Sequence, residues 1–391
     1  MTGRNGRRPG SPTALRDQNR VRVVEELRRQ GQATQADLAR ATGLAPATIS
    51  NIVRDLAGAG SLRIEKRSGK RNSVRLTGGS GFVVGLDLGY RHLTVGISDL
   101  THHVVAQART ELPVGLSADH AMDQARGLLD TALDDAGIER DAVVGAAMGL
   151  PAPVDPTTGR VGAPSILPGW VGVDASALAA TALALPVRVV VDNDANLGAL
   201  AEHQWGAGSG TTDMVYLKLS AGIGAGLIVG GRLYCGFGGT AGEVGHTTVD
   251  EFGAVCRCGN RGCLETLVSA RHVLSLLAPT EGDLSIEEVV GRAVAGDRAF
   301  VRVLDDVGRQ VGTAVAGMCG VLNPELLVLG GELAQAAQIL IPSIQQVVDR
   351  CGVPSAAAAL RIRPAALGSR AHLLGAIARA IADADHSVFI S

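Results

Sequence analysis

Apolar residues recur at helical spacing in two segments near the start of the chain. The first segment, residues 16–30, carries its apolar residues on one face and ends before a glycine. The second segment, residues 34–42, begins at Thr34 and has Asp37 three positions later, an acidic variant of the capping box that starts helices. We therefore expect two short helices here, preceded by a disordered basic leader over residues 1–14.

A third helical segment, residues 47–59, follows a Gly-Leu-Ala-Pro turn. Two helices joined by a tight turn form a helix-turn-helix, whose second helix enters the major groove of DNA. The spacing places the following residues in the core: Ile49, Ile52, Val53 and Leu56. The opposite side supplies the candidate contacts to DNA bases or backbone: Thr48, Ser50, Asn51 and Arg54.

Two short strand-like runs come after the third helix, at residues 62–65 and 73–76. A basic hairpin in this place is typical of a wing, which contacts phosphates or the minor groove beside the recognition helix. The turn between the two runs carries four candidate DNA-binding cations: Lys66, Arg67, Lys70 and Arg71. A helical module for protein interaction would not explain these cations, so we predict a winged helix-turn-helix DNA-binding domain over residues 15–77.

Beyond this domain the pattern changes to alternating strands and helices. A Gly-rich linker precedes a buried run at residues 82–88, which ends in a turn before two more strand-like runs and a helix near 120–136. The same order of strand, turn and strand is repeated later, with a strand at residues 214–219, a Gly-rich turn and a further strand. The repetition predicts a duplicated α/β domain, residues 78–391, with two lobes that close on a cleft. Ligands in such sheets bind at the carboxyl ends of strands, where these turns lie.

Charge is divided unevenly between the two regions. Residues 1–77 contain 16 Lys and Arg and 6 Asp and Glu, whereas residues 78–391 contain 20 and 32. A basic small domain joined to an acidic large one indicates a nucleic-acid partner for the first. A solvated basic tail is the alternative interpretation of the charge alone. Binding through phosphates predicts an affinity that falls as the salt concentration rises.

The composition and the absence of long apolar runs indicate the cellular compartment in which we expect the protein. The chain is 46% hydrophobic and only 3% aromatic, with 52 glycines, which is typical of a globular α/β protein. No apolar run reaches the roughly 18 residues of a membrane helix, and the basic first residues lack the apolar core of a secretory signal. We expect a cytoplasmic protein with no membrane partner. Because thiols stay reduced there, clustered cysteines favour a metal over a disulfide.

Four stretches carry a resemblance to a known protein family. They read GLPAPVD (149–155), DNDAN (192–196), GEVGH (242–246) and CRCGNRGCLE (256–265). With the winged helix before them, they resemble the ROK family of repressors, open reading frames and sugar kinases, from about residue 15 to the end of the chain. The resemblance implies an actin-like, two-lobed fold of the sugar kinase and ribonuclease H type. It also implies a zinc site and a homodimer or homotetramer.

The cysteine cluster and an upstream histidine form a candidate metal site in the loop 246–263. Its four candidate ligands are His246, Cys256, Cys258 and Cys263. Three sulfurs and one nitrogen complete the four ligands of a closed structural zinc site. A disulfide and a redox thiol cluster are the alternatives. The spacing together with the resemblance predicts a structural Zn²⁺, with no open coordination position for catalysis.

The resemblance implies sugar contacts at five positions: Asn193, Asp194, Glu243, His246 and Glu265. Carboxylates and amides of this kind accept from and donate to neighbouring sugar hydroxyls. Glu243 and Glu265 lie close in sequence to the zinc ligands, so we expect the metal loop to hold them in place. Ordinary acidic residues of surface loops are the alternative. Ser165 stands where asparagine is common in the kinases, which leaves the sugar and its orientation open.

The nucleotide elements of the family are altered in this chain. The resemblance implies that Asp194 would be the general base of a kinase. The first phosphate turn would read Asp-x-Gly-Gly-Thr, but Tyr90 replaces the second glycine, so we expect a bulky side chain where the backbone should approach phosphate. The second turn has Ser220-Ala221-Gly222 in place of Gly-Thr-Gly, while Gly330-Gly331 on the adenosine side is kept. We therefore do not expect ATP as a cofactor.

These observations predict a sugar-responsive transcriptional regulator, with repression as the expected mode. A sugar or sugar phosphate in the cleft would close the lobes and change the affinity for a double-stranded DNA operator. One alternative is an active ATP-dependent sugar kinase that also binds DNA. Another is a DNA-binding protein whose pocket binds no sugar and which is controlled by a protein partner.

Overall fold

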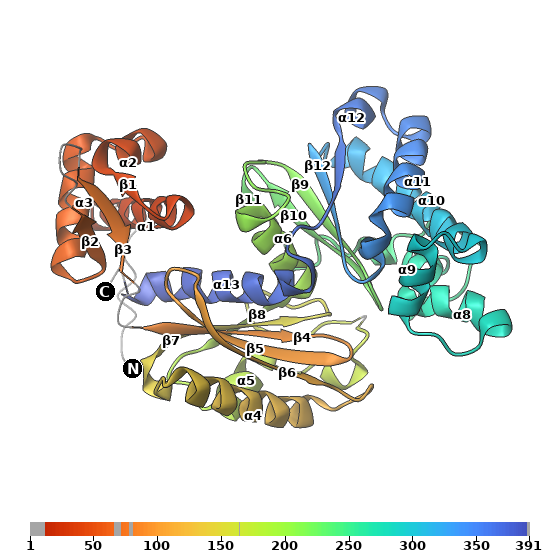
Figure 1. The fold of residues 1–391 in the computed structure, drawn as a ribbon, viewed down its shortest axis with the longest axis horizontal. Helices are drawn as coiled ribbons and strands as arrows, with labels where there is room; N and C mark the ends of the chain where they lie inside the picture. Colours follow the sequence, from red (N-terminus) through yellow and green to blue (C-terminus); the bar gives the residue numbers. More distant parts are fainter. Residues whose placement is uncertain (1–11, 66–71, 78–80, 164, 389–391) are drawn as a thin grey trace.

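Figure 1 shows a small N-terminal domain beside two larger lobes, each built on a five-stranded sheet. The computed structural model describes residues 12–65, 72–77, 81–163 and 165–388. Within these ranges, no helix has the length and apolar character needed to cross a membrane.

The N-terminal domain has three helices: α1 (Pro12–Gln30), α2 (Gln35–Thr42) and α3 (Pro46–Gly58). α1 begins four residues before the predicted start, inside the expected leader, because proline suits the first turn of a helix. The capping box of α2 is confirmed. The Thr34 hydroxyl accepts from the Asp37 amide at 3.2 Å, and the Asp37 carboxylate accepts from the Thr34 amide at 3.1 Å.

A small antiparallel sheet completes the winged helix, with the strand order β1-β3-β2. Its strands are β1 (Ala33–Thr34), β2 (Leu62–Glu65) and β3 (Ser73–Leu76). The four α3 residues predicted for the core are all buried. The predicted wing therefore exists as a hairpin. The cations predicted at its tip, Lys66, Arg67, Lys70 and Arg71, lie outside the described residues.

The first lobe has the strand order β6-β5-β4-β7-β8. Its elements are β4 (Phe82–Leu88), β5 (His92–Asp99), β6 (Val104–Glu111), α4 (Ala118–Ala136), η1 (Arg140–Ala142), β7 (Val143–Leu150), η2 (Pro168–Trp170), α5 (Ala175–Leu183) and β8 (Val189–Asn193). β4 to β6 form an antiparallel meander, and β7 and β8 extend the sheet in parallel. Helices α4 and α5 pack on one face of this sheet through a buried apolar cluster.

The second lobe repeats this topology with the order β11-β10-β9-β12-β13. Its elements are β9 (Met214–Leu219), β10 (Ile223–Val229), β11 (Arg232–Leu233), η3 (Val244–His246), α7 (Glu265–Val268), α8 (Ala270–Glu281), α9 (Ile286–Val294), α10 (Arg298–Val321), β12 (Leu326–Gly330), η4 (Leu333–Ala336), α11 (Ala337–Cys351), α12 (Pro354–Ala359), β13 (Arg361–Pro364) and η5 (Gly368–Arg370). The first three strands are again antiparallel and the last two parallel. The predicted duplication is confirmed.

Two helices, α6 (Asp194–Trp205) and α13 (Ala371–Val388), lie between the sheets of the two lobes (Figure 1). They cross closely, since a Cβ added at Gly375 of α13 would lie 1.9 Å from the Leu197 carbonyl of α6. α13 also lies on the first sheet, where a Cβ at Gly145 would lie 2.6 Å from the Ala380 carbonyl. Glycine is required at these positions because any side chain would separate the helices from their neighbours.

The winged helix packs against the first lobe. Its buried residues form one continuous apolar cluster with Leu100, which lies in the β5–β6 turn, and with Ile381 of α13. The Arg28 guanidinium of α1 donates to the Leu100 carbonyl at 2.9 Å. The DNA-binding domain is therefore held against the β5–β6 turn and the C-terminal half of α13.

Candidate functional site

A cavity of about 410 Å³ opens between the two lobes. It is bordered by the loop after β7, the β8–α6 junction, the β9–β10 turn, η3 and the start of α7. All five predicted sugar contacts line it: Asn193, Asp194, Glu243, His246 and Glu265. The fold thus brings together residues as distant in the sequence as Asn193 and Glu265, which are 72 positions apart. As predicted, the cavity lies where strands end.

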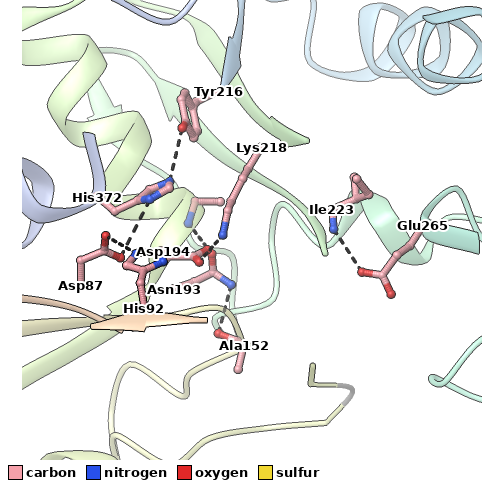
Figure 2. Close-up of polar contacts among 11 residues, drawn as sticks. Asp87, His92, Ala152, Asn193, Asp194, Tyr216, Lys218, Ile223, Glu265 and His372 are labelled. Atoms are coloured by element: carbon pink, nitrogen blue, oxygen red, sulfur yellow. Dashed lines mark hydrogen bonds and ion pairs between the residues drawn. The ribbon is translucent and has the colours of Figure 1, made fainter. Parts of the chain in front are cut away.

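The β8–α6 junction presents Asn193 and Asp194 to this cavity. Asn193 is the N-cap of α6, because its side-chain oxygen accepts from the Ala195 amide at 2.8 Å. Its amide nitrogen donates to the Ala152 carbonyl at 3.0 Å, which fixes the orientation of the side chain (Figure 2). Asp194 occupies the first helical position and is only 3% exposed. A carboxylate at the N-terminus of a helix is stabilised by the helix dipole.

Lys218 of β9 forms an ion pair with Asp194, with 2.5 Å between the Lys218 Nζ and the Asp194 Oδ2 (Figure 2). The Lys218 side chain is 12% exposed and also lines the cavity. Burial lowers the pKa of Lys218, but the Asp194 carboxylate more than offsets this, and the net pKa is raised. Lys218 is therefore charged at neutral pH and neutralises the carboxylate that would serve as a kinase base.

Glu265 and Glu243 place two more carboxyl groups at the cavity. Glu265 is buried, accepts from the Ile223 amide at 3.1 Å and pairs with the Arg257 guanidinium at 2.7 Å. Burial, Asp194 and Glu265 together raise the pKa of Glu243 to about 7. The cavity therefore presents fixed acceptors at Glu265 and Asp194, and a carboxyl at Glu243 that can donate or accept a hydrogen bond near neutral pH.

The four predicted metal ligands converge at one point. The ligand atoms of His246, Cys256, Cys258 and Cys263 all lie within 4.8 Å of one another. The Cys256 Sγ is 3.5 Å from the His246 Nδ1, and the Cys258 and Cys263 sulfurs are also 3.5 Å apart. Ligands of a tetrahedral zinc, with bonds of about 2.0–2.3 Å, lie roughly 3.3–3.8 Å apart, so the donor set fits such an ion. The sulfurs are too far apart for a disulfide, in which they are about 2.05 Å apart.

The turn that closes the Cys/His cluster depends on glycine. Gly262 has a φ of +63°, and a Cβ there would lie 1.4 Å from the Asp250 carbonyl. His246 joins this cluster to the cavity, because its Nδ1 faces Cys256 while its Nε2 is 3.9 Å from the Glu243 carboxylate. The Cys/His cluster and the predicted sugar contacts therefore share one side chain.

A second polar network occupies the region of the first phosphate turn (Figure 2). The buried Asp87 carboxylate contacts the His92 Nε2 at 3.0 Å and lies 4.0 Å from the His372 Nδ1. The His372 Nε2 is 3.4 Å from the Tyr216 hydroxyl. Burial raises the pKa of Asp87, but His92, His372 and Lys218 outweigh this effect, and the net pKa is lowered. The carboxylate is therefore kept ionised inside the protein.

Two bulky side chains lie at the first phosphate turn. Tyr90 packs beside the apolar cluster of the first lobe, and its hydroxyl accepts from Arg271 of α8 in the second lobe at 3.4 Å. The His92 ring lies against Gly89, since a Cβ added there would lie 2.2 Å from it. The obstruction predicted for Tyr90 stays a prediction, and His92 is a second side chain that crowds this turn.

The predicted DNA contacts on α3 lie on its outer side. Ser50, Asn51 and Arg54 are exposed, and Thr48 is half-buried. Arg54 donates to the Asn51 side-chain oxygen one turn earlier on the same helix. No side chain of the described residues covers this polar face, and it remains available for a groove of DNA.

Sequence reasoning missed Lys218, Arg257, His92 and His372 as parts of these networks. Lys218 had a signal, because it is the one charged residue in the apolar strand Met214–Leu219. Its partner Asp194 lies 24 residues earlier, and no spacing rule connects the two. His372 is still more remote, and only the crossing of α13 brings it to Asp87.

Comparisons with known proteins agree with this architecture. The chain matches the family model for the ROK family over residues 83–383 and the model for winged helix-turn-helix DNA-binding over residues 16–60. It is 26% identical to the xylose repressor of Caldicellulosiruptor bescii, over 96% of this chain and 98% of that protein. It is 28% identical to the DNA-binding transcriptional dual regulator NagC of Escherichia coli K12, over 87% of this chain and 86% of NagC.

A solved structure is similar over nearly the same length. The crystal structure of a ROK family transcriptional regulator, a homolog of the E. coli MLC protein, superposes with a TM-score of 0.81 at 26% identity. The match covers 96% of this chain and 98% of that one. The fold is therefore a winged helix-turn-helix followed by the actin-like sugar-kinase fold. On the family match, the four motifs and the shared topology, the chain belongs to the ROK family.

Proposed function

We propose that this protein is a DNA-binding transcriptional repressor whose operator affinity is set by a sugar or sugar phosphate in the interlobe cavity. The winged helix supplies the DNA contact, through α3 and the hairpin beside it. The xylose repressor and NagC, which align over most of the chain, support the assignment. In this proposal Asn193, Asp194, Glu243, His246 and Glu265 bind the sugar hydroxyls.

The pairing of Asp194 is the main observation that favours a sugar sensor over a sugar kinase. The predicted sugar contacts gather around one cavity, and the Asp194 carboxylate among them is paired with the Lys218 ammonium group. A general base must accept a proton from the attacking hydroxyl, and an adjacent ammonium group opposes this by stabilising the ionised carboxylate. His92 also occupies the space over the first phosphate turn. These contacts favour a pocket that binds a sugar over one that phosphorylates it.

We further propose that the Cys/His cluster holds a structural Zn²⁺. The four ligands would leave no open position, so the metal acts on the site only through geometry. It would fix His246 through its Nδ1 and hold the turn that carries Arg257, the ion-pair partner of Glu265. Loss of the metal should therefore loosen both the sugar carboxylates and the loop.

Helix α6 offers a route from the cavity to the DNA-binding domain. It begins at Asp194 in the cavity and ends at Trp205, about 17 Å away at 1.5 Å per residue. The Trp205 ring contacts the His102 ring, with centroids 4.7 Å apart, in the β5–β6 turn on which the winged helix packs. A sugar that binds more tightly to the closed lobes would shift this helix and the docking turn with it.

A titration of the full chain tests the sensor. Isothermal titration with glucose, xylose, mannose, N-acetylglucosamine and their phosphates should show at least one saturable binder, lost in Glu243→Gln. Addition of the same compound should lower the affinity for the promoter DNA of the protein's own gene. If none of these compounds binds, the sensor proposal fails and control by a protein partner takes its place.

An ATP-dependent sugar kinase is the second candidate, and the retained Asp194 is the observation in its favour. A coupled assay of ADP release with the same sugars distinguishes the two. The sensor proposal expects no turnover above background. Turnover that disappears in Asp194→Asn would overturn it.

We propose a homodimer or homotetramer as the DNA-binding form. Helix-turn-helix proteins bind two half-sites one helical turn apart, which requires two copies of α3. Light scattering on the purified protein should give at least twice the 40.0 kDa mass of one chain. A monomer that still binds a two-fold symmetric operator tightly would contradict this arrangement.

A further inference from the structure

A second cavity is lined by other residues of the β8–α6 junction than those at the sugar cavity. Asn193 and Asp194 face the first cavity, whereas Asp192 and Asn196 line the second. The space inside it, counted to its open mouth, is about 520 Å³. None of the proposed sugar contacts lines it.

Two arginines line this second cavity, Arg188 before β8 and Arg379 on α13. Among the described residues neither guanidinium has an ion-pair partner. The Arg379 Nε is buried and has no hydrogen-bond partner there. A guanidinium carries five donors, and buried donors are normally satisfied, so an absent acceptor is the simplest explanation.

Asn196 contributes an unused acceptor. Its side chain is 3% exposed, and its amide nitrogen donates to the Asp192 Oδ1 at 2.8 Å. The Asn196 Oδ1 is buried and accepts from no donor among the described residues. This orientation is fixed by the Asp192 contact, because a flipped amide would place two oxygens against each other. The cavity therefore needs a donor at Asn196 as well as acceptors at the arginines.

Asp192 is the one carboxylate in the wall, so its charge must be weighed against the two arginines. Its Oδ1 accepts from the Asn196 side chain and from the Asn193 amide, both at 2.8 Å. Burial raises its pKa despite these hydrogen bonds and the attraction of the Arg379 charge, which lies beyond ion-pair distance. Two guanidinium groups therefore face at most one negative charge, and the cavity is positive overall.

We propose that this cavity is a second ligand site, for a small phosphorylated metabolite that carries a free hydroxyl group. A phosphate offers three terminal oxygens and can accept from both arginines at once, which a carboxylate does less completely. The hydroxyl group donates to the Asn196 Oδ1. Thr157 and Thr158, two further polar residues, also line the cavity.

The second cavity lies against both α6 and α13, the two helices between the lobes. Asn196 lies two residues after Asp194 on α6, while Arg379 lies on α13. Two residues further along α13, Ile381 belongs to the apolar cluster that includes the winged helix. A ligand bound there contacts the two helices that join the sugar cavity to the DNA-binding domain.

Isothermal titration of the full chain with sn-glycerol 3-phosphate, inorganic phosphate and D-glycerate tests the site. Glycerol 3-phosphate should bind the wild type, and Arg188→Gln and Arg379→Gln should each weaken it at least tenfold. Arg298→Gln, an exposed arginine on α10, removes the same charge elsewhere and should change nothing. Asn196→Ala should weaken glycerol 3-phosphate but leave inorganic phosphate unaffected. D-glycerate should bind more weakly than glycerol 3-phosphate.

The experiment separates this site from the sugar cavity. Glu243→Gln should abolish sugar binding and leave glycerol 3-phosphate binding intact, so the two proposals fail independently. Absence of binding to the wild type at millimolar glycerol 3-phosphate would overturn the second site. Binding that survives both arginine substitutions, or that disappears only in Glu243→Gln, would also overturn it. Because Arg188 is exposed, its variant folds whatever the outcome for Arg379.

Discussion

At the scale of single residues, the sequence predicted which side chains meet but not how their charges are balanced. The five predicted sugar contacts and the four candidate metal ligands could be named because they belong to short motifs visible in the chain, and the structure brings each set together. Lys218 and His92 lie outside those motifs. Their partners, Asp194 and Asp87, are reached through strand pairing and side-chain packing, which spacing does not encode.

The ion pair of Lys218 and Asp194 makes the first prediction. In Lys218→Met the buried Asp194 carboxylate loses its counter-ion, which typically costs about 3–5 kcal/mol in the free energy of unfolding. The double variant Lys218→Met/Asp194→Asn should recover much of this loss, because it leaves no buried charge. Thermal melting of the wild type and the variants measures the effect. Equal melting temperatures for the single and double variants would contradict the pairing.

The metal ligands make the second prediction. Cys258→Ser removes one of four ligands, so the protein should lose its zinc, melt at a lower temperature and bind sugar more weakly. Cys351→Ser is the matched control, because Cys351 is an exposed thiol far from the cluster in sequence. Metal analysis together with melting tests this. Unchanged zinc content in Cys258→Ser would refute the ligand assignment.

At the scale of helices and strands, local signals placed most elements of the N-terminal domain to within a few residues. The Thr34 capping box, the glycine after α2 and the proline that starts α3 each act within one turn, which is why the sequence reveals them. The start of α1 was missed because the leader carries no apolar periodicity. The packing of α1 on the β5–β6 turn was not predictable, since it joins Arg28 to a residue 72 positions away.

The recognition helix makes the third prediction. Asn51→Ala and Arg54→Ala should each weaken operator binding by about 1–3 kcal/mol if the side chain contacts a base edge. A side chain that contacts only phosphate should instead weaken all sequences alike and reduce the salt dependence. Fluorescence anisotropy with operator and scrambled DNA separates these cases, with Arg302→Ala on α10 as the control. Operator binding unchanged in both α3 variants would exclude α3 as the recognition helix.

The β5–β6 turn, which carries His102, leads to the fourth prediction, on how stability depends on pH. Burial, together with Arg28, lowers the pKa of His102 to about 3, from about 6.5 in the unfolded chain. Below pH 6.5 the unfolded chain takes up a proton that the folded protein refuses, so stability falls as the pH falls from 6.5 towards 3. The loss attributable to His102 should be about 1–2 kcal/mol at pH 5.

His102→Asn provides the comparison for this pH effect. His102 has a φ of +68°, a conformation that asparagine tolerates, so the variant keeps the turn while removing the titration. The difference between the melting temperatures at pH 8 and pH 5 should be smaller in the variant than in the wild type. An equal difference in the two proteins would show that His102 does not titrate on unfolding.

At the scale of the whole molecule, the duplicated topology and the winged helix were predictable, because each follows from repeated local patterns. The relation between the two functional regions was not, because it depends on α6 and α13, which cross between the lobes. These helices link the interlobe cavity to the winged-helix domain. The proposed function therefore requires that ligand binding in the cavity and DNA binding by the winged helix be coupled. By linkage, this coupling must act in both directions.

The most direct measurement is operator binding by the full chain, with and without the sugar identified by titration. Anisotropy with labelled promoter DNA should show an affinity at least tenfold lower in saturating sugar, and no change with sugar in Glu243→Gln. By reciprocity, bound operator should weaken sugar binding by the same factor. An operator affinity that is unchanged when the cavity is saturated with sugar would contradict the proposed function.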